Sequence, residues 1–179
     1  MPAYIALLRA VNVSGTNRLS MAEFRRMLES LGYARVETYI QSGNAVFDAN
    51  EPAARVAKAV AAGLEKLMGG PVGVIVRTHD ELARVIAANP YADHAAADGA
   101  RVHVVFLSGV PAAAEIAGLA KIPPRRDRYH CSGDALYLHL PDGAGESKYT
   151  AKTLDRILGV SVTARNWNTV VKLHEMSRR

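Results

Sequence analysis

The feature that most constrains the fold is an order of strands and helices that occurs twice along the chain. In the first half, apolar runs and helix-spaced apolar positions predict strand, helix, strand, strand, helix, strand and a further helix. The expected strands of this half are 4–11, 36–41, 45–49 and 72–77, and the expected helices start at Ser20, at Pro52 and at Thr78 or Asp80. The same order recurs from residue 101 onward, which indicates two copies of one small unit.

The second copy has its own hairpin and its own strand-to-helix corner. Its expected strands are 101–109, 128–132, 135–140 and 160–165, and its expected helices are 111–120, 147–159 and 168–176. A local alignment supports the duplication: "VIVRTHDELAR" (74–84) matches "VTARNWNTVVK" (162–172), so that Arg77 meets Arg165 and Asp80 meets Asn168. The identity is low, and the repeated element order is the stronger argument.

This order of elements predicts the fold class. A β-α-β-β-α-β unit is the ferredoxin-like split βαβ motif, and right-handed crossovers place both of its helices on one face of the sheet. We therefore expect an α+β protein of two tandem ferredoxin-like halves, each βαββαβ plus an extra helix, related by internal duplication. The first half is 1–90, a linker is 91–100 and the second half is 101–179, together one compact unit. One continuous sheet, with edge strands of the halves paired, remains an alternative.

Composition excludes several classes of protein. The chain is 49% hydrophobic and 22% charged, which is typical of a soluble globular protein. No apolar run approaches the roughly 18 residues of a membrane span. The run "PAYIALLRAV" (2–11) is short and is interrupted by Arg9, unlike a signal peptide, so we expect a cytoplasmic location.

Cysteine, histidine and glycine patterns give no cofactor or metal site. Cys131 is the only cysteine, which excludes an internal disulfide, and the six histidines lack metal-ligand spacing. No GxxxxGK[ST] phosphate loop, GxGxxG dinucleotide loop or GxSxG nucleophile elbow occurs. We therefore expect no metal and no cofactor.

Charge is distributed unevenly along the chain. The formal net charge is +5, and residues 101–179 carry 12 Lys and Arg against 7 Asp and Glu, which is +5 by themselves. Residues 1–90 have 10 against 8, and residues 91–100 have none against 2, so these two parts cancel. A basic second half favours an anionic partner.

The polar loops of the second half meet at one edge of its expected sheet. These loops are 121–128, 141–148 and the corner 165–168, and helix N-termini at Ser147 and Asn168 would add positive dipole ends. An edge of this kind is suited to a phosphate or a carboxylate. The candidate ligand-binding residues there are Arg125, Arg126, Lys148, Arg165, Asn166, Trp167 and Asn168.

A second polar edge is expected in the first half. The loop after the first strand and the hairpin turn at Ser42 share this edge, because the first and second strands of the motif run parallel. The candidate residues there are Arg9, Asn12, Ser42 and Asn44.

Several of these residues also have a structural interpretation. Asn168 has the side chain of a helix N-cap, Ser147 is a further candidate cap, and Trp167 would serve as an anchor that closes the sheet edge. Arg9, at the end of a buried strand, would form a buried structural pair.

Two sequence blocks carry a resemblance to a known family. "YIALLRAVNVSGTNRLSMAEFRRMLESLGYARVETYIQSGNAVF" and "TARNWNTVVKL" resemble the bacterial family labelled domain of unknown function 1697, over nearly the whole chain. That family usually has Asn-Val-Gly-Gly where this chain has Asn12-Val13-Ser14-Gly15, and this departure argues against a requirement for both glycines. The resemblance implies an α+β fold of two ferredoxin-like halves and brings no established activity, cofactor or catalytic residue.

Three functions fit the sequence. The first is a module that binds an anionic ligand (a nucleotide, a phosphorylated metabolite or an RNA backbone) at the basic edge near residues 165–168. The second is a protein–protein adaptor that uses exposed sheet edges. The third is an enzyme with an oxyanion- or phosphoryl-stabilising site between the halves. This site would combine Arg9, Asn12, Ser42 and Asn44 with Lys148 and Arg165.

Overall fold

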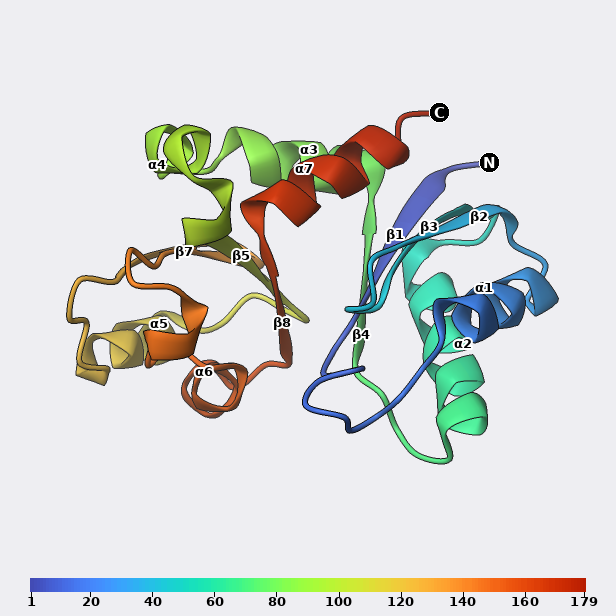
Figure 1. The fold of residues 1–179 in the computed structure, drawn as a ribbon, viewed down its shortest axis with the longest axis horizontal. Helices are drawn as coiled ribbons and strands as arrows, with labels where there is room; N and C mark the ends of the chain where they lie inside the picture. Colours follow the sequence, from blue (N-terminus) through green and yellow to red (C-terminus); the bar gives the residue numbers. More distant parts are fainter. The chain divides into compact units, whose positions relative to one another are not determined.

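The computed structural model describes residues 1–179 and contains two separate four-stranded antiparallel sheets (Figure 1). The first has the order β2-β3-β1-β4, with β1 Ala3–Leu8, β2 Ala34–Tyr39, β3 Asn44–Asp48 and β4 Val74–Thr78. The second has the order β6-β7-β5-β8, with β5 Val102–Leu107, β6 Arg128–Ser132, β7 Ala135–His139 and β8 Val162–Asn166. Both orders are those of the ferredoxin-like motif, and the alternative of one continuous sheet is wrong.

Seven α-helices and three short 3₁₀ helices accompany the strands, and all but the last helix lie between strands. They are α1 Met21–Ser30, α2 Ala53–Met68, α3 His79–Ala87, α4 Ala92–Ala97, α5 Ala113–Ala117, α6 Ala151–Leu158 and α7 Trp167–Met176, with η1 Gly99–Arg101, η2 Gly118–Lys121 and η3 Ala144–Glu146. The segment 91–100, expected to lack regular structure, contains α4, and the helix expected over 111–120 is divided into α5 and η2. None of the helices is long and apolar enough to span a membrane.

Strand register confirms the internal duplication. Ile5, the third residue of β1, lies opposite Arg77 on β4, and Val104, the third residue of β5, lies opposite Arg165 on β8. The alignment of 74–84 with 162–172 pairs the same two arginines. Equivalent strands therefore pair in equivalent register in the two halves.

The first core forms where α1 and α2 cover one face of the first sheet, as Figure 1 shows. Phe24 and Leu28 of α1 are spaced four residues apart, as are Val56, Val60 and Leu64 of α2, and all are buried. This spacing puts them on one helix face, against the side of the sheet that carries Phe47. Burial of each large side chain contributes about 1.5–3 kcal/mol.

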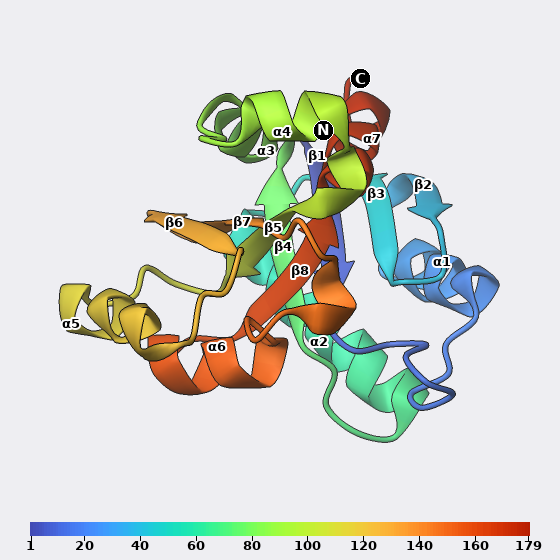
Figure 2. The same cartoon turned by 60° about the vertical axis from the view of Figure 1, so that its left-hand side comes forward.

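The second core has the same plan with shorter helices. Figure 2 shows α5 and α6 on the same side of the second sheet. Leu154 and Leu158 of α6 pack there in one cluster with Leu136 and Leu138 of β7. The side chain of Thr150 accepts a hydrogen bond from the amide of Thr153 and caps α6. The expectation that Ser147 caps this helix is wrong, because the helix begins at Ala151.

The chain divides into two compact units, and the C-terminal segment belongs to the first of them. Met1–Arg84 and Lys172–Arg179 form the first unit, and Val85–Val171 forms the second. Within the first unit, His79 Nδ1 lies 2.8 Å from Ser177 Oγ, and the rings of His79 and His174 stack with centroids 4.4 Å apart. These contacts hold the end of α7 against the start of α3. The sequence-based division at residues 90 and 100 remains a prediction.

Candidate functional site

Asn12 forms hydrogen bonds with its own chain through both atoms of its side-chain amide. Its Nδ2 donates to the carbonyls of Leu19 and Gln41, each at 2.8 Å, and its Oδ1 accepts from the Leu19 amide at 2.9 Å. All three bonds go to the backbone, where they fasten the loop after β1 to the β2–β3 turn. Asn12 also lines a cavity of about 510 Å³, and its part in binding a ligand stays a prediction.

Ser42 and Asn44 lie together in the same hairpin turn, where they also bind the chain. The buried Asn44 donates from Nδ2 to the Tyr39 carbonyl at 3.0 Å and to Ser42 Oγ at 2.9 Å. Arg9, just beyond β1, donates its backbone amide to the Gly73 carbonyl at 2.8 Å. The structure thus brings Ser42 and Asn44 together at the hairpin, and their part in binding a ligand stays a prediction.

The corner that contains Arg165 is a strand-to-helix joint. Arg165 is buried, and its Nη1 donates to Thr163 Oγ1 and to the Ala164 carbonyl, each at 2.8 Å. Burial lowers the pKa of Arg165 to about 10, which still leaves the guanidinium charged at neutral pH. Trp167 is partly buried as the first residue of α7.

Asn166, and not Asn168, caps α7. Asn166 Oδ1 accepts from the amide of Thr169 at 3.0 Å, as Thr78 Oγ1 accepts from the amide of Glu81 at 3.1 Å at the start of α3. The sequence alignment pairs Thr78 with Asn166, so the internal repeat could have predicted Asn166 as the N-cap of α7. Asn168 is exposed, and its Oδ1 lies against the backbone of Gly99.

The two asparagines should therefore differ in their effect on stability. Asn166→Ala removes the cap and is expected to lower the free energy of unfolding by about 1 kcal/mol. The matched control Asn168→Ala should lower it by less than about 0.5 kcal/mol, since an exposed side chain is removed. Urea denaturation of both variants measures the difference. Equal losses would contradict the assignment of the cap.

The basic residues of loop 121–128 line two cavities of the second unit. The first, which we name the arginine cavity, has a volume of about 710 Å³. It is lined by His94, Pro124, Arg125, Arg126, Asp127, Arg128, His139 and Pro141. Three of the four residues 125–128 are arginines, and their guanidinium groups give the cavity its positive charge.

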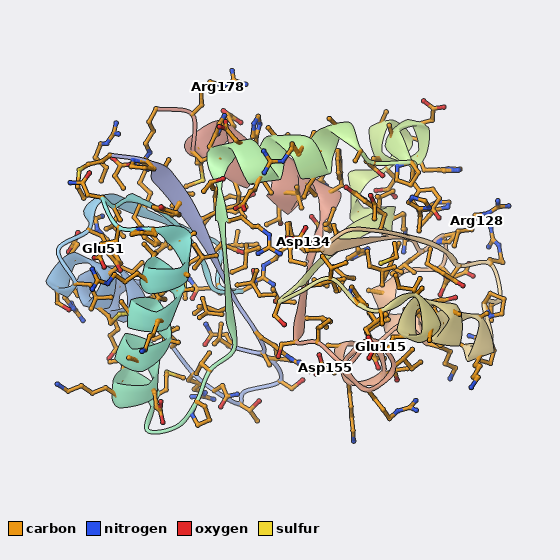
Figure 3. All side chains as sticks on the ribbon, turned by 180° about the vertical axis from the view of Figure 1, so that it is seen from behind. Glu51, Glu115, Arg128, Asp134, Asp155 and Arg178 are labelled. Atoms are coloured by element: carbon orange, nitrogen blue, oxygen red, sulfur yellow. The ribbon has the colours of Figure 1, made fainter.

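The arginines of this cavity are held weakly. Arg126 Nη1 lies 2.7 Å from Asp142 Oδ1, in an ion pair whose side chains are 70% and 43% exposed. Arg125 Nη1 donates to the Glu146 carbonyl over a long 3.4 Å, and Figure 3 shows Arg128 extending away from the ribbon at the edge strand β6. Exposed ion pairs contribute about 0–1 kcal/mol, so a stronger anion can replace Asp142 at small cost.

Two stacked histidines also line the arginine cavity. The rings of His94 and His139 stack with centroids 3.9 Å apart and planes 17° apart, and the Tyr91 ring centroid is 6.0 Å from that of His139. Burial lowers the pKa of His139, and the nearby His94 and Arg128 lower it further. The His139 ring is therefore neutral at pH 7.

The second cavity, which we name the lysine cavity, has a volume of about 560 Å³ and lies beside α5, η2 and α6. Its lining combines Lys121, Lys148 and Arg156 with the apolar side chains of Ile122 and Ile157. These three cations are exposed and form no ion pair. The cavity also contains Glu115, so its formal charge is +2 from three cations and one carboxylate.

The structure thus separates the predicted second-half residues into three groups. Arg125 and Arg126 line the arginine cavity, and Lys148 lines the lysine cavity. The third group, residues 165–168, lines neither. The sequence did not identify His94 and His139 as neighbours, because they lie 45 positions apart and no motif links them. It also did not identify Arg156, because a single cation on an exposed helix face is common.

No group of three His, Cys, Asp or Glu side chains in the structure is arranged to hold a metal ion. His94 and His139 contact each other through their ring faces. The side chains that line the arginine cavity can attract an anion, donate hydrogen bonds from guanidinium groups and stack through their rings.

Comparison with known proteins identifies the fold and names no activity. The model of a family described as "Protein of unknown function (DUF1697)" matches residues 1–137. A structure of a conserved bacterial protein, SP0830 from Streptococcus pneumoniae, matches with a TM-score of 0.78 and 22% sequence identity over 99% of each chain. No curated protein matches the chain. This likeness supports a fold of two ferredoxin-like halves. It gives no information on function, which is argued below from the cavities.

Proposed function

Because the chain belongs to the DUF1697 family of proteins of unknown function, no activity can be carried over, and we propose one from the site alone. The second unit is a binding module for a phosphate-bearing anion, and the arginine cavity is where the phosphate binds. We place this activity in the cytoplasm. A phosphorylated metabolite, a nucleotide or an RNA backbone would supply the group.

The observation that carries this proposal is the gathering of three arginines beside a stacked histidine pair. Arg125, Arg126 and Arg128 face a cavity of about 710 Å³ in which Asp127 is the one carboxylate, so the formal charge is +2. Ligand cavities are typically about 300–1,000 Å³ in volume. The planar guanidinium group matches two oxygens of a phosphate at once, which a lysine ammonium cannot do.

The histidine pair provides a flat aromatic surface beside the three arginines. His94 is exposed, and one face of its ring is covered by His139. Rings of this kind stack with nucleobases, and this stacking is compatible with any base. The cavity therefore suits a nucleotide better than a bare inorganic phosphate.

The test is to remove two arginines and to compare the result with a matched pair. Arg125→Ala with Arg126→Ala is expected to weaken the binding of a phosphorylated ligand at least about tenfold, since each charge-assisted hydrogen bond contributes about 1.5–3 kcal/mol. Titration calorimetry with nucleoside monophosphates, sugar phosphates and short RNA measures this.

The control is Arg25→Ala with Arg26→Ala on α1. That pair also consists of adjacent exposed arginines, and Arg25 has an exposed ion pair with Glu29 at 2.8 Å, much as Arg126 has with Asp142. Both double variants remove the same charge. Equal affinities of the two variants for every ligand would contradict the proposal.

A further inference from the structure

The arginine and lysine cavities are lined by neighbouring parts of one segment. Lys121, Ile122 and Pro123 line the lysine cavity, and the chain from Pro124 to Arg128 lines the arginine cavity. The lining of one cavity therefore passes into that of the other at the Pro123–Pro124 bond. The two prolines fix the backbone φ angle at this boundary.

We propose that the two cavities form one track that binds a single-stranded nucleic acid, with phosphates at the cations of both cavities and a base against the His94–His139 pair. This inference rests on the proposed function and extends it from one phosphate to a chain of them. It assigns a role to Lys121, Lys148 and Arg156, which binding in the arginine cavity does not use.

The first argument for a chain of phosphates is the number of cations and their lack of partners. Each cavity contributes three cations and one carboxylate. The three cations of the lysine cavity have no ion pair, and Arg126 has an exposed one. A single phosphate monoester neutralises two charges at most and would leave one cavity unused.

The second argument is the position of the cations along the chain. Lys121 and the three arginines at 125, 126 and 128 stand on one short segment, which turns where the Asp127 amide donates to the Pro124 carbonyl at 2.8 Å. A strand that follows this segment would meet cations of both cavities.

The third argument is the mixture of surfaces along the track. The arginine cavity has the ring faces of His94 and His139 beside its cations, and the lysine cavity has Ile122 and Ile157 beside its own. Proteins that bind single strands without sequence preference combine a positively charged groove with flat groups for the bases. The track lies along loops and α6, and the sheet faces of the second unit are not needed for it.

The test compares a monomer with a longer strand on the full chain. Fluorescently labelled oligouridylate of twelve nucleotides is expected to bind at least about tenfold more tightly than uridine monophosphate, because it reaches both cavities. Lys148→Ala with Arg156→Ala should weaken binding of the strand at least about tenfold and of the monomer less than about twofold. The slope of log affinity against log salt should fall by about 1.4, at roughly 0.7 for each lost phosphate contact.

The matched control is Arg55→Ala with Lys58→Ala on α2, which also removes one exposed arginine and one exposed lysine. It should leave binding of both ligands unchanged, and circular dichroism should show all variants folded. One outcome would overturn the track and leave the proposed function intact. In that outcome, monomer binding depends on Arg125 and Arg126, the strand binds no more tightly than the monomer, and replacing Lys148 and Arg156 does not change its affinity.

Two further outcomes also decide the matter. Absence of binding by both monomer and strand would overturn the proposed function and the track together. Inorganic polyphosphate with the same number of phosphates should bind more weakly than the strand, because it offers no base to the histidines. Equal affinity would overturn nucleic acid as the ligand of the track.

Discussion

Replacing Asp48 by alanine is expected to lower the free energy of unfolding by about 3 kcal/mol, one of the two largest losses that we predict. The Asp48 side chain is 2% exposed at the end of β3, and its Oδ2 pairs with Arg35 Nε. Its Oδ1 is 3.5 Å from Nη1 of Arg179, whose side chain is only 7% exposed. Removal of the carboxylate leaves the buried guanidinium of Arg179 with less opposite charge nearby. This costs far more folding free energy than the loss of an exposed ion pair.

Glu37 provides the matched control, because it also binds Arg179. Its Oε1 lies 2.7 Å from Arg179 Nη2, but its side chain is 59% exposed. Glu37→Ala should therefore lower the free energy of unfolding by less than about 1 kcal/mol. Urea denaturation followed by circular dichroism compares the two variants. A loss for Asp48→Ala no larger than that for Glu37→Ala would show that the position of the charge in the fold is immaterial.

The Asp48 cluster marks the limit of what the sequence predicts. Asp48 stands in "AVFDA" as an ordinary residue at the end of a strand, and its partners lie 13 and 131 positions away. No periodicity links an internal strand to Arg179. The fold itself was predictable, because strand and helix patterns are local and the element order occurs twice.

The strand-to-helix corner shows a different limit. "RNWN" contains two asparagines, both good caps, and only the hydrogen bond to Thr169 decides between them. The pattern of apolar residues placed the helix start at 168, one residue late. The alignment with Thr78 would have corrected this, because equivalent residues of the two halves cap equivalent helices.

The candidate site was predictable in its charge and not in its shape. Clustered basic residues in 121–128 and Lys148 indicated an anionic ligand. Their division between two cavities depends on how α5 and α6 pack, and His94 meets His139 only because α4 lies beside the end of β7. Such contacts arise from tertiary packing, which leaves no spacing rule in the sequence.

The second large effect is expected at Gly43, in the hairpin turn between β2 and β3. Gly43 has a φ of +84°, and a Cβ there would lie 2.7 Å from Leu8 Cβ and 2.7 Å from Val11 Cγ2. Gly43→Ala should lower the free energy of unfolding by about 2–5 kcal/mol. The left-handed backbone contributes about 1–2 kcal/mol of this, and overpacking against two buried side chains contributes about 1–3 kcal/mol.

The duplication supplies the control for this prediction, because Gly133 occupies the equivalent hairpin turn between β6 and β7. Gly133 also has a positive φ, +59°, but a Cβ there would meet no atom within 4 Å. Gly133→Ala should therefore lower the free energy of unfolding by only about 1–2 kcal/mol, the backbone contribution alone. Urea denaturation of both variants separates backbone strain from close packing. Equal losses would mean that the turn at Gly43 shifts to relieve the overlap, and that its packing against Leu8 and Val11 does not determine the hairpin.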